Sequence, residues 1–250
     1  MNKLSLLIPS FNDERILAIL SELQDYPRCD LEIVIQDGGS RRDTISKMRA
    51  LLRDEDQLII ENDDGIFDGI NKGITNCSNQ FILTVGSDDF VDSSALDQII
   101  QRLRSGSEKI FFLPVRMVEP TSLRLIRYWP VRKFSRLRIF LGTQYPHFGL
   151  VAHKDIYAQL KFNITNKINA DYEFFYDLSK IVRPSAVGYI KSCSVMMRLG
   201  GTSTKNLSSI ISHQFIMISY ALKKNPILLI GLGLKPLYKI QEIIIGFLKR

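Results

Sequence analysis

Short apolar segments alternate with segments of helical periodicity through the first hundred residues of this chain. The expected strands are Leu4–Ile8, Leu31–Gln36, Gln57–Glu61 and Phe81–Val85. The expected helices run from Asp13 to about Asp25, Arg41 to about Arg53, Gly65 to Thr75 and Ser93 to Arg104, with Ser40 as a candidate cap of the second. Apolar strands that alternate with helices predict an α/β fold with a parallel sheet.

Each expected strand is followed by a loop rich in Asn, Asp, Ser and Gly. These loops are 9–12, 37–40, 61–65 and 86–89. In open sheets of this kind, ligands bind beyond the carboxyl ends of the strands. The pattern therefore predicts that the four loops form one polar, ligand-binding edge.

The order of elements is less regular after residue 105. A strand is expected at Ile110–Val118, a helix at Ala170–Ile181 and a further strand at Tyr189–Leu199. We divide the chain into one large α/β domain, residues 1–204, and a basic, apolar, helical tail, residues 205–250.

The net charge of +7 hides a strong asymmetry. Residues 1–100 carry 9 Lys and Arg against 19 Asp and Glu, a net of −10, whereas residues 101–140 carry 10 against 2, a net of +8. Residues 205–250 carry 7 against 1, a net of +6. The first segment suits metal and sugar chemistry, and the later segments suit an anionic partner such as a membrane surface, a phosphate or a nucleic acid.

Three cysteines, Cys29, Cys77 and Cys193, are widely spaced and form no CxxC pair. This spacing argues against a disulfide framework or a thiolate zinc site and favours a reducing compartment. The apolar run Leu4–Pro9 is too short for the core of a signal peptide. We therefore expect a cytoplasmic protein.

Two adjacent carboxylates, Asp88 and Asp89, follow the fourth expected strand. Hard divalent cations prefer such oxygen ligands, and a cation here would neutralise the charge on a departing nucleoside diphosphate. The alternative, which these two residues alone favour, is a polar turn in which an Asp caps the next helix.

A second acidic loop, Asp37-Gly38-Gly39-Ser40, also lies at a strand end. Its carboxylate can accept a hydrogen bond from a nucleobase N–H, and its glycines let a ligand approach the backbone. A tight turn without a ligand is the alternative.

The segment Asp63–Gly73 combines acids with three glycines. Asp68 and Lys72 are four residues apart and can pair on a solvated helix face. That pairing does not account for the glycines at 65, 69 and 73, which weaken a helix unless something must approach it closely.

Taken in order along the chain, these segments resemble glycosyltransferase family 2, the inverting enzymes of the GT-A fold. The matching segments are Ile8–Asn12, Leu31–Ser40, Asp63–Gly73, Gly86–Asp89, His147–Gly149, Ala170–Glu173 and Gly200–Ser203. The third is similar to the pattern DxGIYDAMNKG of one branch of bacterial surface-polysaccharide enzymes. The chain departs from the family at Gly86, where the first acid of a DxD-type motif is usual, at Gln36-Asp37, where two acids are usual, and at Gly69-Ile70, where Ala-Met is usual.

The resemblance implies a nucleotide-diphospho-sugar transferase (GT-A) fold with a Rossmann-like mixed sheet and helices on both faces. It implies a donor nucleotide held by Pro9, Phe11, Asn12, Glu14, Asp37, Gly65 and Asn71, and a divalent metal, Mn²⁺ or Mg²⁺, held by Asp88 and Asp89. It also implies that Asp171 is the base that takes the proton of the acceptor hydroxyl, although the residue by itself favours a helix N-cap. Candidates for contact with the acceptor or the phosphates are His147, Asp68, Lys72 and Ser203, with a structural role equally open for His147.

Apolar clusters and basic residues share the tail. The run Pro226–Leu234 has nine residues before Lys235-Pro236, whereas a spanning helix needs about 20. Its apolar clusters with Lys223, Lys224, Lys235, Lys239, Lys249 and Arg250 favour peripheral contact with anionic lipid. A tail that packs on the domain or forms a dimer is the alternative. The basic, aromatic stretch 124–138 suits lipid headgroups, the diphosphate of a lipid-linked acceptor, or a solvated helix.

The resemblance implies an inverting glycosyltransferase that uses a nucleotide-diphosphate sugar, with UDP favoured. The expected acceptor is a hydroxyl of a polyprenyl-diphosphate-linked glycan in bacterial polysaccharide or O-antigen (lipopolysaccharide) synthesis, at the inner face of the cytoplasmic membrane. The alternative is a related nucleotide-sugar-binding protein without transferase activity. A nucleic-acid partner is disfavoured because residues 1–100 are strongly acidic. A nucleotidyltransferase is disfavoured because no glycine-rich basic loop follows the first strand.

Overall fold

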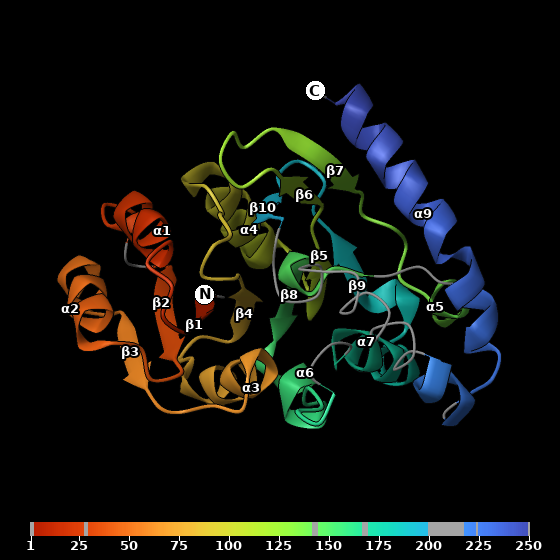
Figure 1. Cartoon of the computed structure of the whole chain (residues 1–250), viewed down its shortest axis with the longest axis horizontal. Helices are drawn as coiled ribbons and strands as arrows, with labels where there is room; N and C mark the ends of the chain where they lie inside the picture. Colours follow the sequence, from red (N-terminus) through yellow and green to blue (C-terminus); the bar gives the residue numbers. More distant parts are fainter. Residues whose placement is uncertain are drawn as a thin grey trace.

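The computed structural model describes residues 3–27, 30–141, 145–166, 170–199, 218–223 and 225–249. Its core is a seven-stranded sheet of order β3-β2-β1-β4-β8-β5-β9 (Figure 1). The strands are β1 Leu4–Ser10, β2 Leu31–Asp37, β3 Gln57–Ile60, β4 Phe81–Thr84, β5 Ile110–Phe112, β8 Leu150–His153 and β9 Val187–Tyr189. β8 runs antiparallel to β4 and β5, and the other neighbouring pairs are parallel. This mixed, mainly parallel sheet confirms the predicted α/β class.

Helices cover both faces of this sheet (Figure 1). One apolar cluster includes residues of α1 (Ile16–Leu23), α2 (Arg42–Leu51) and α4 (Ser93–Ser105), and the other includes residues of α3 (Ile66–Asn76), α6 (Lys154–Gln159) and α7 (Ala170–Ile181). In β1, Leu6 and Ile8 belong to the first cluster and Leu7 to the second. Because both faces of the strand are covered, it has a continuous apolar sequence rather than an alternating one.

Helix α3 lies close against the sheet because two of its residues are glycines. A Cβ atom at Gly73 would lie 2.3 Å from Leu7 Cδ1, and one at Gly69 would lie 3.0 Å from Asp63 Oδ2. The groups that closely approach the glycines of α3 are therefore Leu7 of the sheet and Asp63. Gly65 serves differently, because its φ of +121° is one that residues with a side chain rarely adopt.

A second sheet of order β10-β6-β7 lies beside the first (Figure 1). Its strands are β6 Val115–Val118, β7 Leu125–Trp129 and β10 Val195–Arg198. The single strand expected at Ile110–Val118 is wrong, because the chain leaves β5 at Pro114, which has no N–H to donate, and enters β6 in the other sheet. The strand expected at Tyr189–Leu199 divides in the same way, between β9 and β10.

The basic stretch 124–138 is not one solvated helix, because it forms β7 and leads into α5 (Arg136–Phe140). Two of its arginines bind the C-terminal helix α9 (Leu228–Leu248) through Glu242, which is 1% exposed. Arg127 Nε donates to Glu242 Oε2 at 2.6 Å, and the Arg132 guanidinium donates to Oε1. These buried ion pairs fix α9 against β7. None of the helices in the described ranges is both long and apolar enough to cross a membrane.

Removal of the Glu242 charge should weaken this attachment. A buried ion pair that loses one partner leaves the other charge uncompensated, so we expect Glu242→Gln to lower the free energy of unfolding by about 3 kcal/mol. Urea unfolding followed by circular dichroism measures this loss. Cζ of Arg127 lies 4.5 Å from the ring centroid of Trp129, the chain's single tryptophan. Because Arg127 also pairs with Glu242, tryptophan fluorescence should report release of α9 as well. Glu22→Gln, on the exposed side of α1, is the control, and an equal loss in both variants would contradict the assignment.

Candidate functional site

A hydrogen-bond network around Asp37 joins the loops that follow β1 and β2. Asp37 is fully buried, and its Oδ1 accepts from the amides of Ser40 at 2.6 Å and Gly39 at 3.0 Å. The Ser40 hydroxyl donates to Asp37 Oδ2 at 2.6 Å and accepts from the Asn12 amide at 2.7 Å. The expectation that Ser40 caps α2 is wrong, because its hydroxyl is committed to Asp37 and the cap residue is Arg41. Two predicted residues, Asp37 and Asn12, are thereby brought together.

Asp63, which was not among the predicted site residues, adds a further carboxylate. A Cβ atom at Gly38 would lie 2.6 Å from Asp63 Oδ2, and Asp63 Oδ1 accepts from the Gly65 amide at 2.9 Å. Burial and the charges of Asp68 and Asp37 raise the pKa of Asp63 above its usual value, against the opposing effect of the Gly65 hydrogen bond. The signal for this position was in the sequence, since glycines at 38 and 69 leave the space that Asp63 occupies.

Asp88 and Asp89 converge beside Gly86. A Cβ atom at Gly86 would lie 2.7 Å from Asp89 Oδ2 and 3.3 Å from Asp88 Oδ1. Asp89 is 4% exposed and accepts from the amides of Gly86 and Arg198, each at 3.1 Å. Burial and the neighbouring charge of Asp88 raise the pKa of Asp89 to about 7. The glycine that departs from the DxD pattern therefore leaves room for the two carboxylates.

Two arginines that the sequence did not single out flank this pair. Arg15 binds both carboxylate oxygens of Asp13, and its Nη1 donates to Asp88 Oδ2 at 3.0 Å. The Arg198 guanidinium, at the end of β10, donates to the main-chain carbonyl of Asp88. The Ser87 hydroxyl donates to Asp13 Oδ2 at 2.7 Å. The loops after β1 and β4 are thus cross-linked, and positive charge lies on two sides of the carboxylates.

The Asp88–Asp89 pair fits a divalent cation, although it does not by itself complete a coordination shell. Both carboxylates face the space left by the absent side chain of Gly86, and Asp88 remains partly exposed. Within the described ranges, no group of three or more His, Cys, Asp or Glu is arranged to hold a metal ion. A cation bound here would therefore draw further ligands from a bound substrate and water, as Mg²⁺ commonly does.

The other residues predicted to hold the donor differ in what they contact. Pro9 is buried in β1, whereas Phe11 is 62% exposed. The Glu14 carboxylate pairs with Lys47 of α2 at 2.7 Å. Gly65 has no atom within 4 Å of the position that a Cβ would take. Phe11 and Gly65 therefore present open surface, while Pro9 and Glu14 are engaged within the fold.

Asn71 has both polar atoms of its amide engaged. Its Nδ2 donates to the Phe162 carbonyl at 2.8 Å, and its Oδ1 accepts from the Phe162 amide at 3.0 Å. Farther round α3, Lys72 pairs with Asp68 and with Glu61, each at 3.1 Å. The Asp68–Lys72 pair, expected from their spacing, is present.

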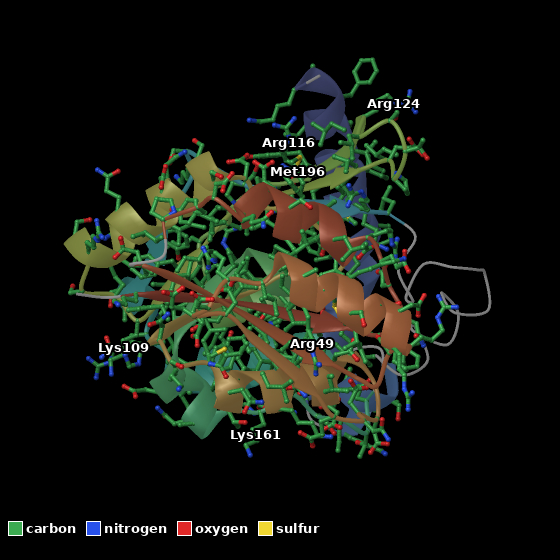
Figure 2. All side chains as sticks on the ribbon, turned by 90° about the vertical axis from the view of Figure 1, so that its left-hand side faces the viewer. Arg49, Lys109, Arg116, Arg124, Lys161 and Met196 are labelled. Atoms are coloured by element: carbon green, nitrogen blue, oxygen red, sulfur yellow. The ribbon has the colours of Figure 1, made fainter. Side chains whose placement is uncertain are left out.

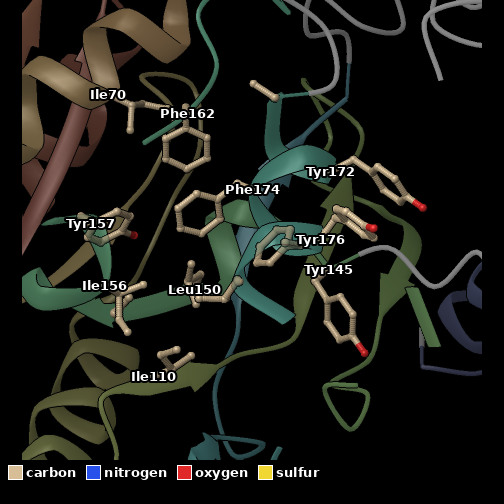
Figure 3. Close-up of a cluster of buried hydrophobic side chains, with 14 of the residues drawn as sticks. Ile70, Ile110, Tyr145, Leu150, Ile156, Tyr157, Phe162, Tyr172, Phe174 and Tyr176 are labelled. Atoms are coloured by element: carbon tan, nitrogen blue, oxygen red, sulfur yellow. The ribbon is translucent and has the colours of Figure 1, made fainter. Parts of the chain in front are cut away.

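Helix α7 is held against α3 by stacked aromatic rings. Phe162 lies between Phe67 of α3, at a centroid distance of 5.5 Å, and Phe174 of α7, at 4.5 Å; Figure 3 shows Phe162 beside Phe174 in this cluster. Asp171 lies in the first turn of α7, partly buried, and its Oδ1 accepts from the Tyr172 amide at 2.7 Å. A carboxylate is favoured there by the helix N-terminus.

Lys235 of α9 is buried, so the expectation that it faces a membrane is wrong. It is 5% exposed, its ammonium lies 5.1 Å from the Tyr172 ring centroid, and it has no hydrogen-bond partner within the part of the chain the structure describes. Burial lowers the pKa of Lys235 to about 8, with the charge of Asp171 opposing. Burial raises the pKa of Asp171, and the Tyr172 amide and Lys235 oppose that rise.

His147 is buried in the aromatic cluster, which favours the structural alternative. Its ring lies 4.6 Å from the Phe162 ring in an edge contact, and its Nε2 has no hydrogen-bond partner among the described residues. Burial lowers the pKa of His147 to about 3, so the imidazole is neutral at neutral pH. Ser203 and the rest of the Gly200–Ser203 segment lie outside the described residues.

A family model described as glycosyl transferase family 2 matches residues 5–161. This match includes the loops that carry Asp37, Asp63, Asp88 and Asp89.

Two curated proteins show partial sequence similarity. The chain is 30% identical over 116 residues to the GalNAc(5)-diNAcBac-PP-undecaprenol beta-1,3-glucosyltransferase of Campylobacter jejuni, covering 44% of this chain and 38% of that protein. It is 29% identical over 102 residues to the poly(ribitol-phosphate) beta-N-acetylglucosaminyltransferase TarS of Staphylococcus aureus, covering 38% of this chain and 18% of TarS. Both matches thus span less than two fifths of the relative's length.

Solved structures confirm the predicted fold. The structure superimposes on S. aureus TarS 1-349 in complex with UDP-GlcNAc with a TM-score of 0.64 and 17% identity, covering 88% of this chain and 66% of the other. It superimposes on the mannosyltransferase PcManGT of Pyrobaculum calidifontis, in complex with GDP-Man and Mn²⁺, with a TM-score of 0.62 and 15% identity, covering 98% and 73%. The chain has the GT-A fold of these glycosyltransferases.

The buried state of His147 predicts a pH dependence of stability. Below pH 6.5 the unfolded chain protonates this imidazole while the folded chain does not, so stability falls as the pH drops from 6.5 toward 3. Between pH 7 and pH 5 this residue should remove about 2 kcal/mol from the free energy of unfolding. Urea unfolding at both pH values should show that His147→Phe lacks this loss. His153→Gln, the control, should keep it, and an unchanged pH slope in His147→Phe would contradict the assignment.

Proposed function

The chain belongs to glycosyl transferase family 2, and we propose that it transfers one sugar, with inversion, from a nucleotide-diphosphate sugar to a hydroxyl of a lipid-linked glycan. The observation that carries this proposal is the gathering of acidic loops at the carboxyl edge of the parallel strands. Asp37 is the last residue of β2, Asp63 follows β3, and Asp88 and Asp89 follow β4. Open α/β sheets bind ligands at this edge.

For the donor, we propose that the nucleotide lies over the ends of β1, β2 and β3. Asp37 Oδ2 accepts one hydrogen bond, from Ser40, and a carboxylate oxygen has capacity for another from a nucleobase N–H. The exposed ring of Phe11 offers a face for stacking, and Asn12 joins the two loops. The other residues proposed to line the donor nucleotide are Pro9, Glu14, Gly65 and Asn71. Those proposed to contact the acceptor or the phosphates are Asp68, Lys72 and Ser203. A UDP-sugar is favoured because TarS, which shares the fold, was solved with UDP-GlcNAc.

For the leaving group, Asp88 and Asp89 are the proposed ligands of Mn²⁺ or Mg²⁺. Such a cation, when bound, offsets the charge that develops on the departing diphosphate. Arg15 and Arg198 hold the loop that presents these carboxylates and add positive charge beside it. This electrostatic arrangement is preorganised, so little reorganisation is needed as the charge develops.

For the acceptor, Asp171 is the proposed base. In an inverting displacement the acceptor oxygen attacks the anomeric carbon as the bond to the diphosphate breaks, and the hydroxyl proton passes to a carboxylate. Burial raises the pKa of Asp171, which makes it a stronger base than an exposed aspartate. We assign Lys235 as a positioning residue, because its buried charge acts on Asp171 from α9.

For the setting, we propose bacterial surface-glycan synthesis, such as that of O-antigen or another lipopolysaccharide component, at the inner face of the cytoplasmic membrane. The Campylobacter relative is named for an undecaprenol-diphosphate-linked acceptor, and TarS is named for poly(ribitol-phosphate). A polyprenyl-diphosphate-linked glycan is therefore the acceptor class that we propose. His147, being neutral and buried, supports this site through packing.

Asp171→Asn should slow sugar transfer strongly. Because general-base catalysis contributes a factor of about 10² to 10⁴ in rate, we expect a loss of that size in kcat. Transfer from UDP-, GDP- and dTDP-sugars is measured with Mn²⁺ present, using membrane lipid extracts as the acceptor source. Asp177→Asn, farther along α7 and ion-paired with Lys180 at the surface, is the matched control.

The double variant Asp88→Asn/Asp89→Asn tests the metal proposal in the same assay, with calorimetric titration of Mn²⁺ as a second measurement. Full activity in both this variant and Asp171→Asn would overturn the site. Binding of a nucleotide sugar with no transfer by the unmodified chain would instead favour the non-catalytic alternative.

Lys235→Met tests the positioning role. Loss of the ammonium charge removes an influence that lowers the pKa of Asp171, so the acid limb of the kcat/KM profile should move to higher pH. Lys239→Met, one turn along α9, is the control and should leave that limb in place. An unshifted limb in Lys235→Met, in a variant with normal unfolding, would show that Lys235 only packs.

A further inference from the structure

Helix α9 has an exposed apolar face, which we call its outer face. The outer face consists of Leu229, Ile230, Leu237, Ile240, Ile243, Ile244, Phe247 and Leu248, each between 36% and 78% exposed. Their spacing of three, four or seven residues places them along one side of a helix of 3.6 residues per turn. The stripe runs from the first turn of α9 to its last.

The opposite side of α9 is fixed to the protein. Its buried residues are Leu228, Gly231, Lys235, Glu242 and Gly246. Glu242 is ion-paired with Arg127 and Arg132, and a Cβ at Gly246 would lie 3.0 Å from the Tyr128 amide nitrogen. Because this side is held by β7, the helix cannot rotate to bury its outer face.

Exposed apolar side chains are concentrated in this part of the molecule. Of the 18 large apolar side chains that are exposed in the described residues, 11 lie between Ile218 and Leu248, including Ile218, Leu222 and Ile227 just before α9. The other seven are scattered over the rest of the chain. A contiguous apolar surface of this kind marks an interaction site.

Apart from Glu242, the charged residues between positions 218 and 249 are positive. Lys223, Lys239 and Lys249 are exposed. Glu242 is the only acidic residue between positions 218 and 249, and its charge is buried against the two arginines. Arg124 is exposed on the β6–β7 turn, which also carries Glu119, at the end of the molecule where α9 ends (Figure 2). An apolar stripe bordered by lysines and arginines complements an anionic lipid surface.

A second copy of the chain is a poorer match for this face. Two copies paired through their outer faces would bring Lys239 and Lys249 of each toward a surface that offers no exposed carboxylate between 218 and 249. A bilayer with anionic headgroups supplies both the apolar layer and the opposite charge.

We infer that the outer face of α9 is a docking surface for an anionic membrane, on which the helix lies parallel to the bilayer plane. The inference rests on the proposed function only in that a lipid-linked acceptor places the reaction at a membrane. The same helix carries Lys235 on its buried side, where its charge acts on Asp171. Docking of α9 therefore sets the orientation of the proposed base relative to the lipid surface.

The test uses the full chain and sedimentation with vesicles of equal parts phosphatidylglycerol and phosphatidylcholine, compared with vesicles of phosphatidylcholine alone. We expect binding to the anionic vesicles that weakens as salt increases. Ile240→Glu/Ile244→Glu, in the middle of the outer face, should lower the partition coefficient by about tenfold or more.

The matched control is Ile164→Glu/Ile181→Glu, which makes the same chemical change at exposed positions away from α9. It should bind within about twofold of the unmodified chain, since apolar insertion rather than net charge dominates the loss. Thermal unfolding of each variant checks that the fold is retained.

Equal loss in the two double variants, or equal binding to both kinds of vesicle, would overturn the inference. So would absence of vesicle binding together with a dimer, seen by light scattering, that Ile240→Glu/Ile244→Glu converts to a monomer. Mn²⁺-dependent hydrolysis of nucleotide sugars separates this inference from the proposed function. Hydrolysis without vesicle binding would contradict only the docking surface. Vesicle binding without hydrolysis or transfer would contradict only the proposed transferase activity.

Discussion

Parallel hydrogen bonding among β1, β2, β3 and β4 fixes where the candidate site can form. The ladder sets Ser10 opposite Asp37 and Asp37 opposite Ile60, with Leu7 opposite Thr84. Because neighbouring parallel strands point the same way, their following loops emerge at one edge. Acidic residues that are distant in the sequence thereby become neighbours, and the arrangement needs no side chain to specify it beyond those that bury the strands on both faces.

Placing several carboxylates at one edge creates repulsion that the surrounding groups must offset. Arg15 forms ion pairs with Asp13 and Asp88. The main-chain amides of Gly86 and Arg198 donate hydrogen bonds to Asp89. Burial is the main cause that raises the pKa of Asp89 and of Asp63, and the neighbouring acids add to it. A site with residual negative charge is suited to a cation or to cationic side chains, and it would not hold a nucleoside diphosphate well without one or the other.

Helix α9 joins two parts of the proposed function through its two sides. Its buried side meets β7 through Glu242 and approaches Asp171 through Lys235, while its outer side is apolar and bordered by basic residues. Because α9 is fixed to the domain on one side, a partner bound to its other side would have a defined orientation relative to the domain. The sequence left open whether the tail packs on the domain or meets lipid. One side of α9 packs on β7, and lipid contact is proposed for the other side.

The sequence by itself determined the strands, the helices between them and the polar edge, because apolar periodicity and glycine or aspartate at strand ends are local properties. It also indicated Asp37, Asp88 and Asp89 as candidates, because they stand at or just after the ends of apolar segments. The apolar pattern did not show that the strand expected at Ile110–Val118 divides at Pro114 into β5 and β6. Nor did it distinguish the buried Lys235 from the other lysines of the tail. Only the tertiary structure decided the partners of Asp88, since Arg15 and Arg198 lie 73 and 110 residues away. Long-range pairing and the burial of a single lysine depend on how helices and sheets pack, and that packing has no local signature in the chain.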